Sequence, residues 1–125
     1  MLFRSETQHG GGTFIDKYVF PRGELPHLSQ VIQSMQDAGL ETFDVENLRR
    51  HYARTLTLWA QRYETASEQV RQHVDEKTYR IWRVYLAGCA HAFAIDQVSI
   101  YQVLCRHANT PAENLPWSRR YIYQD

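Results

Sequence analysis

Residues 75–105 read DEKTYRIWRVYLAGCAHAFAIDQVSIYQVLC, a pattern typical of one long amphipathic helix followed by a strand. Asp75 is a good helix N-cap, and apolar side chains then recur at spacings of three, four or seven through Tyr79, Leu86 and Phe93. The segment after this helix is rich in β-branched and aromatic residues, which favour extended backbone. The stretch therefore predicts a helix over 75–94 and a strand over 98–105.

Working upstream, the same reasoning predicts two further helices and one short strand. Pro26 suits a first helical turn and Gly39 suits the residue just past a helix end, which predicts a helix over 26–38. Residues 40–45 alternate between two faces and predict a strand. A helix over 47–73 follows, with an aromatic stripe on one face. We expect residues 21–26 to be a constrained loop between two ordered segments, and the fold class to be α+β, with about three helices and two strands.

Two strands make an unusually small sheet for a chain of 125 residues. The strand predicted over 98–105 is apolar on both faces, and such strands normally have neighbours on either side. The sequence therefore predicts that this chain pairs its strands with another chain or forms part of a larger sheet.

Composition excludes several classes of protein. Fourteen basic and fourteen acidic residues give a formal net charge of zero, which argues against a nucleic-acid binder. Two cysteines do not make a disulfide framework and suit a reducing compartment. No apolar run approaches the ~18 residues of a membrane-spanning helix, and the first twenty residues lack a signal-peptide pattern. We expect a cytoplasmic chain, with at most peripheral contact at the inner membrane surface.

Candidate chemical groups are few. The six histidines lack metal-ligand spacing, so we expect no metal site. Cys89 and Cys105 are interpreted as structural thiols. Tyr52 follows His51 and precedes Arg54, and its phenol could donate a hydrogen bond to an anion or a reacting group. The arginines around it fit either a solvated helix face or a weak contact with anionic lipid headgroups.

Four motifs, in order, resemble one family. The segment FIDKYVFPRGELP, residues 14–26, is similar to the FI-x-x-Y-[IV]-F-P-x-G-x-L-P motif of the cyclopropane-fatty-acyl-phospholipid synthases, which include the mycolic acid cyclopropane synthases. HYARTLTLW, residues 51–59, resembles the family's HY-x-x-TL-x-x-W, and RIWRVYLAGC, residues 80–89, resembles R-x-W-x-x-YL-x-x-C. LPWSRRYIY, residues 115–123, is similar to the closing segment of one branch.

This resemblance implies the C-terminal half of a Rossmann-like (class I) methyltransferase fold, in which the two predicted strands are the last two of the sheet. Family members transfer a methyl group from S-adenosylmethionine to an alkene carbon of an unsaturated acyl chain, and a bound bicarbonate accepts a proton as the ring closes. By position in the motif, Tyr52 corresponds to the tyrosine that holds the bicarbonate. The resemblance also implies a substrate pocket shaped by Phe20, Pro21, Gly23 and Trp59.

The family's cofactor loop and its other bicarbonate ligands lie upstream of the matched region. We therefore predict three segments: a flexible N-terminal segment over 1–13 that supplies no strand, a C-terminal portion of the methyltransferase domain over 14–107, and a tail over 108–125. We expect this chain to bind neither S-adenosylmethionine nor bicarbonate alone, and to need a missing N-terminal half that completes a phospholipid acyl-chain methyltransferase.

Two alternatives belong to other classes of function. The chain could be a non-enzymatic helical module that completes its sheet by pairing with a second copy, since exposed strand edges favour such pairing. It could also be a lipid carrier that keeps an acyl pocket without chemistry.

Overall fold

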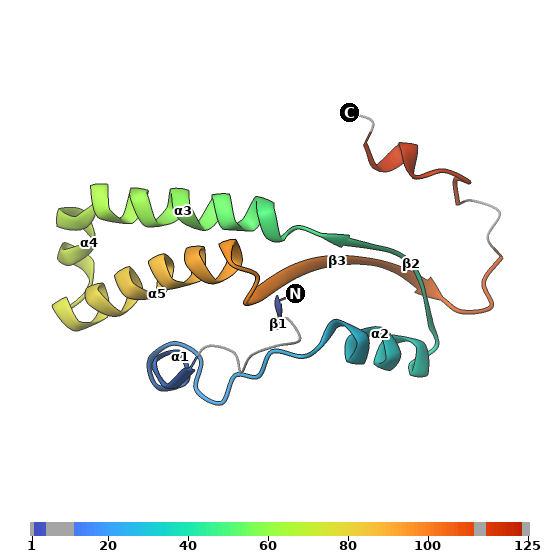
Figure 1. Ribbon diagram of the computed structural model, residues 1–125, viewed down its shortest axis with the longest axis horizontal. Helices are drawn as coiled ribbons and strands as arrows, with labels where there is room; N and C mark the ends of the chain where they lie inside the picture. Colours follow the sequence, from blue (N-terminus) through green and yellow to red (C-terminus); the bar gives the residue numbers. More distant parts are fainter. Residues whose placement is uncertain (1, 5–11, 112–114, 124–125) are drawn as a thin grey trace.

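The computed structural model describes residues 2–4, 12–111 and 115–123. It is an elongated molecule in which a helical hairpin continues into a long, curved β-ribbon (Figure 1). In chain order the elements are β1 Leu2–Arg4, α1 Gly12–Tyr18, α2 Leu28–Asp37, β2 Leu40–Asn47, α3 Arg49–Thr65, α4 Ser67–His73, α5 Glu76–Ala94, β3 Val98–His107 and the 3-10 helix η1 Arg119–Ile122.

The helical hairpin consists of α3 and α5, joined at its tip by α4 (Figure 1). The helix predicted over 47–73 is therefore two helices, which meet at Ala66. Just before this point the hydroxyl of Thr65 donates a hydrogen bond of 3.0 Å to the carbonyl of Gln61. Such back-bonding tends to bend a helix. The bend allows the chain to reverse direction, so that α5 returns along α3.

The core lies between the two long helices and is small. Leu56 on α3 and both Leu86 and Phe93 on α5 form one buried cluster. Several large apolar side chains are instead exposed, with 51% of Phe20, 45% of Trp59 and 43% of Trp82 accessible. Exposed apolar surface of this kind marks an interaction or ligand-binding face.

The sheet has the order β1-β3-β2, with β3 in the middle. Both neighbours run antiparallel to β3, so β1 and β2 point the same way. The neighbours expected for the strand over 98–105 are β1 and β2 of this chain, and pairing with another chain or within a larger sheet stays a prediction. Doubly wound sheets often carry one antiparallel strand near an edge of an otherwise parallel sheet, and the class I methyltransferase portion predicted from sequence agrees with this arrangement.

Two differences concern the N-terminal part. Leu2–Arg4 forms a strand paired with Val98–Ile100, whereas the sequence predicted a flexible segment without a strand. Three residues are too short to show an alternation, and only the pairing with β3 defines them. Residues 1 and 5–11 of that predicted segment lie outside the described residues. The second difference is that α1 begins at Gly12, inside that predicted segment, whereas residues 21–26 form the loop that the sequence predicted.

The remaining elements pack on the ribbon. Helix α2 lies against β2, and β2 contains an irregularity between Thr42 and Asp44. In the tail, Arg119 of η1 forms an ion pair of 2.6 Å with Asp44, whose side chain is largely buried. The part of the predicted tail that is described is thus attached to β2, while residues 112–114 and 124–125 lie outside the described residues.

Candidate functional site

Tyr52 lies on the first turns of α3, where the hairpin meets the sheet. Its ring packs against Phe93 on α5, with centroids 5.0 Å apart, and edge-on against Trp59 two turns later on α3, at 6.2 Å. Spacing of seven residues places Tyr52 and Trp59 on one helix face. Tyr52 is half-buried, because its ring borders the core cluster.

The loop after α1 presents Phe20 to the hairpin. The backbone N–H of Gly23 donates to the carbonyl of Phe20 at 2.9 Å, and the N–H of Arg22 donates to the Asp16 carboxylate at 2.7 Å. A Cβ at Gly23 would lie 3.0 Å from the Cβ of Phe20 and 3.1 Å from its carbonyl oxygen. A side chain at this position would therefore force Phe20 to shift, and Pro21 restricts Phe20 to extended backbone.

Tyr85 on α5 connects the two halves of the predicted site. Its ring contacts Phe20 edge-on at 6.0 Å and Trp82 at 5.4 Å. Its hydroxyl shares a hydrogen bond with Cys89, one turn later, and lies within electrostatic range of Tyr52. We name this group the aromatic cluster. It consists of Phe20, Tyr52, Trp59, Trp82, Tyr85 and Phe93.

Burial controls the ionisation of the polar groups in this cluster. Burial, with the Cys89 hydrogen bond second, raises the pKa of Tyr85 above its ordinary value. Burial also raises the pKa of Cys89, and the hydrogen bond with Tyr85 partly opposes this shift. Both groups therefore remain protonated at neutral pH, so that the cluster carries polar atoms but no charge.

The structure thus brings together three residues predicted to form the site and adds two that sequence reasoning missed. Phe20, Tyr52 and Trp59 belong to the aromatic cluster, while Pro21 and Gly23 shape the loop that holds Phe20. Tyr85 was not singled out, and Cys89 was interpreted as a structural thiol. The signal was present in the sequence, since residues four apart on a helix lie on one face.

The arginines near Tyr52 have separate environments. Arg50 and Arg54 are exposed, as is His51. Arg49, grouped with them in the sequence as a solvated or lipid-contacting side chain, instead donates a hydrogen bond of 2.8 Å to the carbonyl of Phe93 and pairs with Asp96. Arg49 thus gives hydrogen-bond donors to carbonyl groups at the C-terminal end of α5, which have no partners within the helix.

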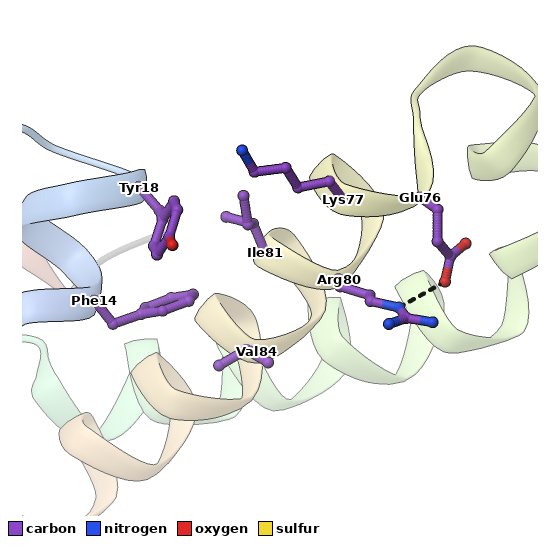
Figure 2. Close-up of a pocket in the computed structure, with 7 residues that line it drawn as sticks. All are labelled: Phe14, Tyr18, Glu76, Lys77, Arg80, Ile81 and Val84. Atoms are coloured by element: carbon purple, nitrogen blue, oxygen red, sulfur yellow. Dashed lines mark hydrogen bonds and ion pairs between the residues drawn. The ribbon is translucent and has the colours of Figure 1, made fainter.

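Two open grooves lie outside the aromatic cluster. The first has a volume of about 510 Å³ and runs between α1 and the first half of α5 (Figure 2). The second, of about 620 Å³, lies at the junction of α3 and α4 near Leu58 and Arg62. Tyr52 lines neither groove.

No helix in residues 2–4, 12–111 or 115–123 is long and apolar enough to cross a membrane. Within the same ranges, no three histidine, cysteine, aspartate or glutamate side chains are grouped as a metal ion would need.

Comparison with known proteins gives a consistent result. The family described as mycolic acid cyclopropane synthetase matches residues 2–103. The chain is 48% identical over 116 residues to a probable fatty acid methyltransferase of Pseudomonas putida, covering 92% of this chain and 29% of that protein. It is 37% identical over 104 residues to the tuberculostearic acid methyltransferase UfaA1 of Mycobacterium tuberculosis, covering 82% of this chain and 23% of that protein.

Solved structures agree with the sequence relatives. The chain superposes on mycolic acid cyclopropane synthase CmaA1 complexed with SAH and CTAB with a TM-score of 0.71 at 33% identity, covering 74% of this chain and 32% of that one. The cyclopropane synthase MmaA2 from Mycobacterium tuberculosis gives a TM-score of 0.70 at 30% identity, covering 74% of this chain and 33% of that one. The chain therefore spans a third or less of these relatives, and it belongs to the mycolic acid cyclopropane synthetase family.

Proposed function

We propose that this chain forms the acyl-chain-binding portion of an S-adenosylmethionine-dependent methyltransferase that acts on unsaturated acyl chains of phospholipids. The observation that carries the proposal is the aromatic cluster, in which Tyr52 contacts Trp59 and Phe20 contacts Tyr85, with Phe20 and Trp59 partly exposed. Such a face suits an acyl chain, because apolar walls exclude water from it.

The chemistry of methyl transfer to an alkene explains why aromatic side chains suit this place. When an alkene carbon attacks a sulfonium methyl group, positive charge develops on the neighbouring carbon. Aromatic rings attract positive charge through their negative faces. Tyr52, Trp59 and Phe20 would stabilise that charge without offering a nucleophile that competes for it, and the protonated Tyr85 and Cys89 add no charge of their own.

Tyr52 fits one part of a bicarbonate site. A buried anion needs hydrogen-bond donors directed at it, and a phenol supplies one without adding charge. Bound bicarbonate supplies a base that takes up a proton from the alkylated chain. The described residues offer Tyr52 as one donor, so further donors would come from other residues of the enzyme. Tyr52 would therefore orient the anion rather than hold it alone.

The cofactor site does not belong to this portion in our proposal. The sequence contains no glycine-rich nucleotide loop. Strand β1 pairs with β3 alone among the residues described, and its other edge suits a further strand from a cofactor-binding portion. We therefore propose that the chain is inactive alone, and that it works in the cytoplasm at the inner membrane surface, where its phospholipid substrate lies.

The test is reconstitution. The portion of the Pseudomonas putida relative that lies outside the matched 29% is co-expressed with this chain. Transfer of labelled methyl groups from S-adenosylmethionine to dioleoyl phospholipid is then measured. We expect activity from the pair and none from either part. Tyr52→Phe should lower kcat by about 10²-fold or more, whereas Tyr121→Phe, on exposed η1, should not. Undiminished activity of Tyr52→Phe would exclude the proposed role of Tyr52.

A second candidate function rests on the exposed side chains of Phe20, Trp59 and Trp82. This face could instead be covered by a second copy of the chain in a non-enzymatic dimer, or could carry a lipid without chemistry. Light scattering distinguishes the first alternative, because a stable monomer would exclude it. Titration with labelled oleate addresses the second, and absence of binding would exclude a carrier.

A further inference from the structure

The first groove has an apolar floor and a charged rim. Phe14 and Tyr18 point from α1 toward Ile81 on α5, and Val84 extends the apolar surface (Figure 2). Lys77 lies on the rim of the groove on the side of Tyr18. An open apolar groove with a cationic group on its rim complements an anionic lipid, which has an apolar chain attached to a negative headgroup.

The chain has only two lysines, and both lie beside the same ring. The Nζ of Lys17 is 5.2 Å from the centroid of Tyr18, and the Nζ of Lys77 is 5.9 Å from it. They come from different elements, α1 and α5. Across the described part of the chain, neither forms an ion pair. Lysine is a compact point charge on a flexible stem, a common binder of phosphate.

The carboxylates next to Lys77 are already engaged. Asp75 accepts a hydrogen bond of 2.6 Å from the backbone N–H of Thr78, as the N-cap of α5. Glu76 forms ion pairs with Arg71 at 2.9 Å and Arg80 at 2.8 Å. Lys77 interacts electrostatically with Asp75, but the ion pairs of Glu76 go to the two arginines, and Lys77 lines the groove.

We propose that this groove binds the phosphate end of the phospholipid substrate, with Lys17 and Lys77 contacting the phosphate and the acyl chain lying over Ile81 and Val84. This inference rests on the proposed function and adds the position of the headgroup. The acyl chain would then continue along α5 to Tyr85, where the aromatic cluster begins.

The spacing along α5 agrees with this path. Lys77 and Tyr85 are eight residues apart, which corresponds to about 12 Å along a helix. The distance from a phospholipid phosphate to the middle of an extended unsaturated acyl chain exceeds this length, so the chain would reach Tyr85 and extend beyond it. The phosphate site and the methyl-transfer site would therefore be connected by one helix, and the helix would set which carbons reach Tyr52.

The experiment measures whether a lipid phosphate protects the two lysines. The 125-residue chain is acetylated with an amine-selective reagent, and modification of Lys17 and Lys77 is followed by mass spectrometry. Three probes are added in turn: oleoyl lysophosphatidylglycerol, monoolein with the same acyl chain but no phosphate, and inorganic phosphate. We expect the lysophospholipid to protect both lysines, and the other two probes to leave them reactive.

Variants provide the second measurement. The double variant Lys17→Gln/Lys77→Gln should weaken lysophosphatidylglycerol binding by about tenfold or more, because hydrogen bonds to charged groups are lost. The matched control Arg50→Gln/Arg54→Gln removes the same charge from the exposed face of α3 and should change binding by no more than about twofold. Circular dichroism confirms that each variant is folded.

Several results would overturn the inference. They are full reactivity of both lysines with lysophosphatidylglycerol present, equal protection by inorganic phosphate or by monoolein, and a larger effect of the Arg50/Arg54 control. The reconstitution assay is scored separately. If the reconstituted enzyme transfers methyl groups but the lysines are not protected, only the phosphate site is refuted. If the lysines are protected but the reconstituted enzyme transfers no methyl groups, only the proposed function is refuted.

Discussion

The guanidinium of Arg49, at the start of α3, donates a hydrogen bond of 2.8 Å to the carbonyl oxygen of Phe93, near the end of α5. It also contacts the carbonyl of Ala94 at 3.2 Å and pairs with Asp96 at 3.3 Å. A cation at this place satisfies carbonyls that the helix leaves open and interacts favourably with the helix dipole. The side chain of Arg49 thus connects the start of α3 to the end of α5, close to the ring of Tyr52.

Replacing Arg49 by glutamine should therefore destabilise the hairpin. We expect a loss of about 1–3 kcal/mol in the free energy of unfolding, since charge-assisted hydrogen bonds to partly buried carbonyls are lost. Urea unfolding followed by circular dichroism measures it. Arg50→Gln, an exposed neighbour, is the control and should change stability by less than about 0.5 kcal/mol. Equal effects of the two substitutions would contradict the role given to Arg49.

The small core makes each buried side chain important. Leu56 is 4% exposed and packs with Leu86 and Phe93, whereas Leu58 on the same helix is 42% exposed. Leu56→Ala should cost about 2–5 kcal/mol of unfolding free energy, because it leaves a cavity. Leu58→Ala should cost less than about 1 kcal/mol. If both variants unfolded at the same urea concentration, the core would not lie where the structure places it.

Gly23 and Gly88 allow a second comparison of matched substitutions. A methyl group at Gly23 would meet the Cβ and carbonyl of Phe20, while one at Gly88 meets nothing within 4 Å. Gly23→Ala should displace Phe20 and destabilise the chain by about 1–3 kcal/mol. Gly88 lies at an exposed position of helix α5, and Gly88→Ala should stabilise the chain by about 0.5–1 kcal/mol.

The consequence of Gly23→Ala for the site is measured by NMR. Contacts between the rings of Phe20 and Tyr85, whose centroids are 6.0 Å apart, should weaken in Gly23→Ala and persist in Gly88→Ala. Unchanged ring contacts in the first variant would show that the loop holds Phe20 without help from Gly23.

The protonated pair Tyr85–Cys89 predicts a loss of stability at alkaline pH. Burial raises the pKa of both groups, so the folded state holds their protons more tightly than the unfolded state does. Their contribution is complete below the ordinary cysteine value of 9.0 and decreases as the pH rises above it. Urea midpoints between pH 8 and pH 10.5 measure this decline.

The two cysteines allow a control for that measurement. Cys89→Ala removes one of the titrating groups, so its stability should decline less steeply with pH than that of the original chain. Cys105→Ala, which changes the other half-buried cysteine, should leave the decline unaltered. A decline that depends on Cys105 instead would contradict the assignment.

Much of the fold was predictable, and for local reasons. The helix predicted over 75–94 is observed as Glu76–Ala94, and the strand predicted over 98–105 as Val98–His107. Both have strong periodicity, and the helix begins at an Asp75 cap, so the pattern alone defines them. The strand at Leu2–Arg4 was missed because it depends on pairing with β3, far away in the sequence, and the break at Ala66 because no glycine or proline marks it.

Some residues of the candidate site were likewise predictable from the sequence, and others were not. Motif resemblance selected Phe20, Tyr52 and Trp59 from the sequence, and the structure places all three in one aromatic cluster. The roles of these residues in binding and chemistry remain predictions. Tyr85 stands in the R-x-W-x-x-YL-x-x-C motif, one turn before Cys89, but its contact with Phe20, 65 positions upstream, is seen only in the structure.

The sequence by itself determined the family, the long helices and the strand β3, since these depend on motifs and periodicities within short stretches of chain. Only the tertiary structure decided that β3 lies between β1 and β2, that Arg49 closes the hairpin, and that Lys17 and Lys77 lie beside one tyrosine ring. The physical reason is that periodicity specifies which face of an element is apolar. It does not specify which distant face will cover it, because that depends on how the whole chain closes around its core.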